Sequence, residues 1–468
     1  MNKKNELTRN TVILTIGKLC TQFISFLLLP LYTSLLSPQE YGSVDLFNTY
    51  CMLLLPVFNW QLDSGMFRFL LDCRDDKDRQ KLIFTTILNT CFIQTVLYLL
   101  FFAFAYNYMT SGYRIYLALD VILNIFLCSL LQFARGIGKI THYTVASFIS
   151  AVSMVGINVL LIAVFHFGAE GMYFATVAAK LITILYLTYA LRTREYYMWW
   201  CFDQNLFKEI AKYSLPLIPN QFSWWVIGVS DRVIISALLG MPANGIYSVA
   251  NKFSGLFITF YNIFNLSWTE SASLHLYDED EEQFLTEMVN TIFFFFASGC
   301  FGLIAIMPFI FPFMINSQYQ DAYKQIPILM IAVLFQVLVG LYSAVYVATR
   351  KTKEIAKTSF WAAVVNILFN ILLIKKLGLY AASLSTLAAY LTMGIYRYFH
   401  VKQYVNMPIR KRSALGAIMA GSVSIISYYW GNRIVKITSL IVICIYLILA
   451  NRKTGRYVFR LVRKKLKK

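Results

Sequence analysis

Charged residues are scarce in this 468-residue chain. Asp, Glu, Lys and Arg together make up only 14% of it, against 58% hydrophobic residues, which excludes an ordinary soluble globular protein. The eight cysteines are scattered and form no C-x-x-C pair, and there are only four histidines. The sequence therefore predicts neither a disulfide framework nor a metal site, and no other cofactor motif is present.

The chain is instead built from fourteen apolar stretches that follow one another almost from end to end. A helix needs roughly 20 mostly apolar residues to cross the hydrocarbon of a bilayer. We therefore predict an all-α polytopic membrane protein with fourteen transmembrane helices. The predicted spans are 10–36, 42–66, 82–106, 113–134, 143–167, 168–191, 215–240, 243–266, 284–311, 325–348, 358–374, 377–396, 413–430 and 434–450.

Basic residues fall in every second connection between these spans. With the N-terminus inside, the inner segments hold 32 of the 42 Lys and Arg residues, and the outer connections hold six. This bias predicts a multi-pass protein of a bacterial cytoplasmic membrane with both termini cytoplasmic. The net charge of +19 is then explained by anionic lipids of the inner leaflet and not by nucleic acid. The tail 452–468, with nine cations, either forms a basic amphipathic helix on that leaflet or only fixes topology.

The order of the spans predicts two six-helix lobes and two additional C-terminal helices. The predicted divisions are an N-terminal lobe 1–191, a cytoplasmic connector 192–214, a C-terminal lobe 215–400, and a region 401–468 with two helices and the basic tail. Within the connector, the stretch from Leu206 to Tyr213 has the pattern of a short amphipathic helix. Prolines inside the spans, such as Pro56, predict bends.

Seven charged residues stand out because they lie inside apolar spans, where a charge costs on the order of 2.5–3.5 kcal/mol. They are the cations Lys18, Lys180, Arg232 and Lys252 and the carboxylates Asp45, Asp63 and Asp231. We expect the cations to line a water-filled cavity that favours an anion, above all a phosphate. The three carboxylates are candidates for binding a coupling proton or sodium ion.

Simpler interpretations of the same residues remain open. Lys180 can pair with a carboxylate purely for packing, and Asp231 can pair with Lys252 while Arg232 reaches outward. Lys18 can extend to the cytoplasmic interface. In each of these cases the charge has a structural role only.

Two segments carry a resemblance to a known family. Residues 230–240 (SDRVIISALLG) with 245–252 (GIYSVANK), and residues 36–42 (LSPQEYG), resemble signatures of bacterial oligosaccharide flippases. These are the polysaccharide transporters of the multidrug/oligosaccharidyl-lipid/polysaccharide exporter superfamily. The span count and the layout of six, six and two spans also fit that family. The motif Tyr41-Gly42-Ser43-Val44 and the related Ile246-Tyr247-Ser248-Val249 further suggest that the two halves are repeats.

The resemblance implies a transporter and not an enzyme. Members of the family move undecaprenyl-pyrophosphate-linked oligosaccharide units between leaflets by alternating access, for capsule, exopolysaccharide or other surface polysaccharides. It implies that Arg232 and Lys252 contact the pyrophosphate or acidic sugars, that Lys180 and Lys18 assist, and that a carboxylate couples transport to a cation gradient. The expected partners are the lipid-linked oligosaccharide, membrane lipids, and polymerase or assembly proteins.

Three alternatives remain. A peptidoglycan-precursor flippase and a multidrug/cation antiporter belong to the same superfamily, although a cation exporter should have a more acidic interior. A membrane glycosyltransferase or polymerase needs an outer loop with catalytic residues, and the predicted outer connections are short.

Overall fold

The computed structural model describes residues 23, 26–108, 111–199, 201–276, 278–279, 281–349 and 351–452. Within these ranges the secondary structure is entirely helical, and no strand occurs. The chain divides into two compact units, Met1–Gly245 and Ile246–Lys468. The fold is therefore all-α, as predicted, whereas the four-part division of the sequence stays a prediction.

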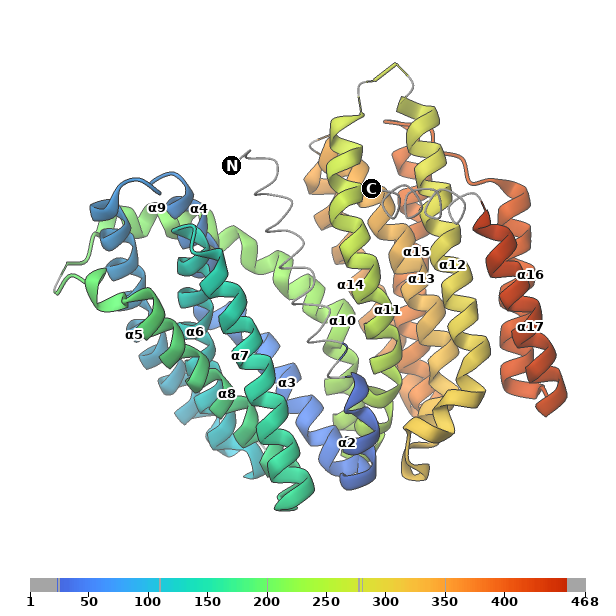
Figure 1. Ribbon diagram of the computed structural model, residues 1–468, viewed down its shortest axis with the longest axis horizontal. Coiled ribbons are helices and arrows are strands. Elements are labelled where there is room, and N and C mark those ends of the chain that lie inside the picture. Colours follow the sequence, from blue (N-terminus) through green and yellow to red (C-terminus); the bar gives the residue numbers. More distant parts are fainter. Residues whose placement is uncertain are drawn as a thin grey trace, which may run out of the picture. The chain divides into compact units, whose positions relative to one another are not determined.

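The first unit contains a short helix at its start, a bundle of long helices and a connector helix (Figure 1). Its α-helices are α2 (Leu29–Leu35), α3 (Pro38–Asn59), α4 (Leu62–Leu71), α5 (Lys77–Ala105), α6 (Arg114–Gly136), α7 (Ile140–Val159), α8 (Gly168–Leu191), α9 (Gln204–Ser214) and α10 (Ile218–Leu238). A π-helical turn, Leu160–Val164, extends α7.

The described residues of the second unit form seven long helices, the first of which begins within the last residues of the first unit. They are α11 (Met241–Leu274), α12 (Glu281–Met314), α13 (Asp321–Ala348), α14 (Thr352–Leu377), α15 (Leu379–Val401), α16 (Lys411–Trp430) and α17 (Arg433–Ala450). Helix α15 packs against both α13 and α14, and α12 packs against α13, α16 and α17.

The observed helices follow the predicted spans closely. Thirteen helices in the described ranges have 18 or more residues, and each coincides with one predicted span. Of these, eight are apolar enough along their length to cross a membrane by composition alone. The first predicted span is described only near its end, where α2 lies. The protein is therefore a multi-pass membrane protein.

The second predicted span differs from the prediction because it is two helices and not one. Helix α3 ends at Asn59, and Trp60 and Gln61 then adopt left-handed backbone conformations, with φ of 52° and 54°. Such conformations cost about 1–3 kcal/mol each in non-glycine residues and persist only where the surroundings impose them. The break lies four residues after Pro56, which is itself inside α3. It gives α4 a different direction from α3, so that α4 becomes a separate packing element.

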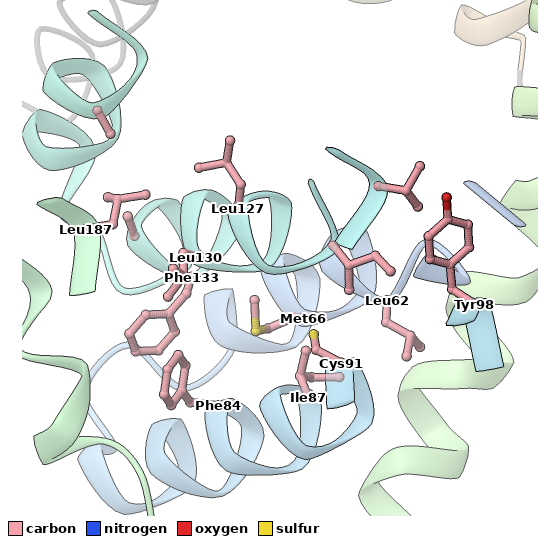
Figure 2. Packing of buried hydrophobic residues seen from close by; sticks show 14 of the residues in the cluster. Leu62, Met66, Phe84, Ile87, Cys91, Tyr98, Leu127, Leu130, Phe133 and Leu187 are labelled. Carbon is pink, nitrogen blue, oxygen red and sulfur yellow. The ribbon is translucent and has the colours of Figure 1, made fainter. Parts of the chain in front are cut away.

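Helix α4 forms the centre of the first unit's core. Leu62 and Met66 on α4 are 1% exposed and lie between residues of α5 and α6 (Figure 2). The ring of Phe84 on α5 packs against the ring of Phe133 on α6, with 4.4 Å between the ring centroids. Helix α4 therefore supplies buried side chains that pack against both α5 and α6.

The connector forms the amphipathic helix that its sequence predicts. Asp203 caps α9, since its carboxylate accepts hydrogen bonds from the backbone N–H groups of Asn205 and Leu206. Leu206 and Ile210 are buried, and α9 packs on α4. At Gly65 a Cβ atom would lie 2.2 Å from the Ser214 hydroxyl, so only glycine allows this approach.

The starts of α3 and α11 meet in a close crossing that explains both resemblance motifs. Ser37 and Glu40 form a reciprocal capping box around Pro38, which begins α3. A Cβ on Gly42 would lie 2.1 Å from the Met241 carbonyl oxygen, and one on Gly245 would lie 2.0 Å from that of Pro38. The two glycines are therefore required for the helix backbones to touch, as in other small-residue helix crossings in membranes.

Replacing Gly245 by Ala should destabilise the fold. The new methyl group overlaps the Pro38 carbonyl, so the backbones must separate, at a cost of about 1–3 kcal/mol or more. Thermal unfolding of the purified protein in detergent measures this loss. Gly156→Ala is the matched control, because Gly156 lies on α7 with no atom within 4 Å of the added Cβ. Equal melting temperatures for the two variants would contradict the crossing.

Candidate functional site

Lys180 on α8 forms an ion pair with Asp120 on α6. Its Nζ lies 2.5 Å from Asp120 Oδ1, and the two side chains are 16% and 1% exposed. The second carboxylate oxygen, Oδ2, accepts a hydrogen bond of 3.0 Å from the Asn124 amide. A buried pair repays its desolvation only when the remaining hydrogen-bonding groups are satisfied, and Asn124 provides this for Asp120.

Asp120 was missing from the sequence-based set of deep charges. It is the one acidic residue in the predicted span 113–134, so an exhaustive search for acids inside spans would have found it. Depth alone does not reveal the pair, because Lys180 lies twelve residues into α8 and Asp120 only six into α6. The long lysine side chain bridges this difference.

Arg232 on α10 pairs with Asp45 on α3. The distance between Arg232 Nε and Asp45 Oδ2 is 3.0 Å, and the side chains are 18% and 11% exposed. The two atoms are not aligned as a hydrogen bond, so the contact is mainly Coulombic. The Trp225 indole, two turns earlier on α10, donates to the Thr49 carbonyl at 3.0 Å and holds α10 along α3. Arg232 therefore contacts an acid inside the unit and does not reach outward.

Helix α3 lies beside both ion pairs. It carries Asp45 itself, and its Cys51 lies near Asp120. Helix α3 also packs against α6, α8 and α10. Asp45 and Cys51 are six residues apart, which corresponds to roughly 9 Å along a helix. Only the Arg232–Asp45 pair includes a residue of α3, whereas the Lys180–Asp120 pair joins the helices beside it.

Asp63 is stabilised by a neighbouring amide and by its place at a helix start. It lies in the first turn of α4, directly after the helix break, and it is 9% exposed. Its Oδ1 accepts a hydrogen bond of 2.7 Å from the Asn59 amide. The start of a helix also carries a partial positive charge that favours a carboxylate. The break in the second span thus provides the environment that Asp63 needs.

Two of the remaining predicted residues lie on α10 and α11. Asp231 is buried on α10, at 3% exposure. Lys252 is partly buried on α11 and belongs to the second unit. Lys18 lies outside the described residues. The described part of the chain contains no cluster of three or more potential metal ligands.

The two ion pairs can exchange partners chemically. A phosphate or diphosphate offers the same oxygen acceptors as a carboxylate and binds Arg in a two-point contact and Lys as a point charge. Such an anion can therefore replace Asp120 or Asp45 beside the cation. The released carboxylate can then take up a proton or a cation. Neither exchange requires a covalent step.

Removing one member of the Lys180–Asp120 pair should destabilise the protein more than removing both. Lys180→Met or Asp120→Leu alone leaves an uncompensated buried charge, with a cost of roughly 3–5 kcal/mol, whereas the double variant should recover most of the loss. A double-mutant cycle of thermal unfolding measures the coupling. The control is Arg68→Gln, which breaks the exposed Arg68–Asp72 pair and should leave the melting temperature unchanged. Additive losses would contradict the pair.

Comparisons with known proteins agree with this architecture. Residues 7–268 match the family described as polysaccharide biosynthesis protein, and no curated protein sequence matches the chain. Among solved structures, lipid II flippase MurJ in an inward closed conformation matches with a TM-score of 0.70 at 16% identity, covering 96% of this chain and 99% of that one.

A multidrug resistance MATE transporter of the MOP superfamily, in an inward-facing conformation, matches with a TM-score of 0.68 at 15% identity, covering 82% of this chain and 95% of that one. An outward-facing MATE transporter gives a TM-score of 0.58 at 16% identity, covering 85% and 94%. At these identities the solved structures show a shared fold only. The family match covers more than half of the chain and therefore shows family membership. The protein belongs to the polysaccharide biosynthesis protein family and has the fold of MOP-superfamily transporters.

Proposed function

We propose that the protein is a flippase for undecaprenyl-pyrophosphate-linked oligosaccharide repeat units, which it moves across the cytoplasmic membrane by alternating access. The observation that carries the proposal is the presence of two ion pairs, Lys180–Asp120 and Arg232–Asp45, inside apolar helices of the family-matched region. Purely structural pairs in such helices are often no better than apolar residues. An ion pair whose cation can release its carboxylate and bind a passing diphosphate would instead have a functional role.

Charge balance alone does not select the substrate. With Asp120 included, the number of deep carboxylates equals the number of deep cations, four of each. The excess of positive charge inferred from the sequence therefore disappears. The argument for an anion rests instead on exchange: the diphosphate takes the place of a carboxylate at Lys180 or Arg232 while the headgroup passes. When it leaves, the carboxylate returns and the resting pair forms again.

The same exchange offers a means of coupling. A substrate drives a conformational change only if it binds one state better than another, and an opened pair is a state that the diphosphate favours. Asp45 and Asp120 become free to bind a proton or sodium ion in that state. Asp63 and Asp231 stay candidates for the same role, and Lys18 and Lys252 for headgroup binding, by resemblance to the family. Enzymatic activity has no place in this scheme.

A second candidate function is supported by a specific likeness. The solved lipid II flippase shares the fold over nearly the whole chain, and a peptidoglycan precursor also carries a diphosphate on a polyprenyl chain. The family description names polysaccharide biosynthesis, which supports the first candidate. Translocation assays with both lipids separate the two candidates, because the preferred headgroup should be carried faster. The polymerase or assembly partners of a polysaccharide pathway belong to the first candidate only.

Neutralising the deep cations should reduce translocation of lipid-linked oligosaccharide in proteoliposomes. Lys180→Gln, Arg232→Gln and Lys252→Gln each remove a charged contact to the diphosphate, worth about 1.5–3 kcal/mol, so roughly 10- to 100-fold slower transport is expected. The control is Lys376→Gln, an exposed cation at the end of α14. Full activity of all three variants at normal protein levels would reject the proposed site.

The proposed orientation predicts opposite accessibility for the two ends of α14. Lys353 and Lys376 are exposed and lie in the first and last turns of this helix. In a cysteine-free background, Lys376→Cys should react with a membrane-impermeant maleimide on intact cells, and Lys353→Cys should react only after lysis. Labelling of both positions on intact cells, or the reverse pattern, would contradict the orientation.

A further inference from the structure

The second unit contains a polar pocket that the transport scheme does not use. It lies between α12, α16 and α17 and has a volume of about 330 Å³. These three helices pack against one another and stand together in Figure 1. Arginines line one part of the pocket and apolar side chains line another. The lining includes Glu287, Asn290 and Phe294 on α12, Arg410 and Arg412 at the start of α16, and Tyr446, Leu449 and Asn451 at the end of α17.

The basic part of the pocket has an unbalanced positive charge. Arg410, Lys411 and Arg412 are consecutive at the start of α16, where the side chain of the N-cap residue Arg410 does not cap the helix and no acidic residue occupies the first turn. The backbone N–H groups there and the helix dipole add to the positive potential. Cations at this end of a helix oppose its dipole, and a bound anion would relieve the repulsion.

The backbone that carries the arginines is held in place from α12. The Asn290 amide oxygen accepts a hydrogen bond of 2.8 Å from the Arg410 backbone N–H, and its nitrogen donates to the Pro408 carbonyl at 2.9 Å. Glu287 pairs with Arg410 at 3.7 Å, and both side chains are about half exposed. A pair of that length and exposure is weak and competes little with a stronger anion.

Apolar side chains also line the pocket, and two of the helices that form it expose apolar residues. Phe294, Tyr446 and Leu449 are among the lining residues, and α16 and α17 expose large aliphatic residues, among them Ile418 and Ile448. In a membrane protein such residues contact lipid chains. A ligand of this pocket therefore needs an anionic head and an apolar tail in contact with the bilayer.

We propose that this pocket binds the headgroup of an anionic phospholipid, with its phosphate on Arg410, Arg412 and the start of α16. The basic connections at this end of the helices are those expected to face the cytoplasmic leaflet, where anionic lipids are available. Pockets that combine arginines and helix ends at a membrane surface are suited to lipid phosphates. The proposal is independent of the substrate that the protein transports.

The test uses the full-length protein in nanodiscs of phosphatidylcholine, with phosphatidylglycerol as the probe and native mass spectrometry to count bound lipid. The double variant Arg410→Gln/Arg412→Gln should bind phosphatidylglycerol at least about tenfold more weakly, because it loses two charged phosphate contacts. The matched control is Lys351→Gln/Lys402→Gln, which removes the same charge from exposed residues that do not line the pocket. It should bind like the wild type.

A second variant keeps the test decisive if the arginine variant folds poorly. At Gly416 on α16 a Cβ lies 3.6 Å from the Tyr446 ring, an ordinary contact, so Gly416→Leu fills the pocket without changing charge. It should also weaken phosphatidylglycerol binding. Equal losses in the arginine and lysine variants would reduce the effect to surface charge and overturn the proposal. Unchanged binding in both pocket variants, or full competition by water-soluble glycerol phosphate or by the transport substrate, would overturn it as well.

Discussion

The cost of placing a charge inside a membrane is the constraint on which this structure depends. Lys180 and Arg232 lie in apolar helices, and each is balanced by a carboxylate from a neighbouring helix. The two contacts join α8 to α6 and α10 to α3, and α3 lies beside both. Ion pairs of this kind add little net stability over well-packed apolar residues, although losing one partner is costly. This is the reason for our proposal that the charges change partners during transport.

Three local backbone features position the helices around these pairs. A capping box begins α3, a glycine–glycine contact brings its start against the start of α11, and a left-handed break after Asn59 releases α4 into the core. The same break places Asp63 at a helix start, where a carboxylate is tolerated. The residues that resemble the flippase signatures are thus largely those that hold the helices near the paired charges.

Hydropathy and charge patterns were sufficient to predict the helices of the fold. They were not sufficient to predict which carboxylate pairs with each deep cation. The span 168–191 coincides with α8 to the residue, because the length of an apolar helix is set by the bilayer. The break at Trp60 and Gln61 was missed, since it depends on tertiary packing and carries no glycine. Asp120 was overlooked although its sequence position was visible, and its pairing with Lys180 depends on how α6 and α8 are offset along their axes. Pairing of Arg232 with Asp45 joins helices far apart in the chain, which single-sequence spacing does not reveal.

Our central proposal is that the deep ion pairs are kept for transport and not for folding. The most direct measurement is oligosaccharide translocation by the doubly apolar variant Lys180→Met/Asp120→Leu, compared with the wild type at equal folded protein. The account predicts a stable protein that no longer carries the diphosphate-linked substrate efficiently, because the cation that the diphosphate needs is gone. A stable variant that translocates the substrate at the wild-type rate would contradict the claim and reduce the pair to a packing element.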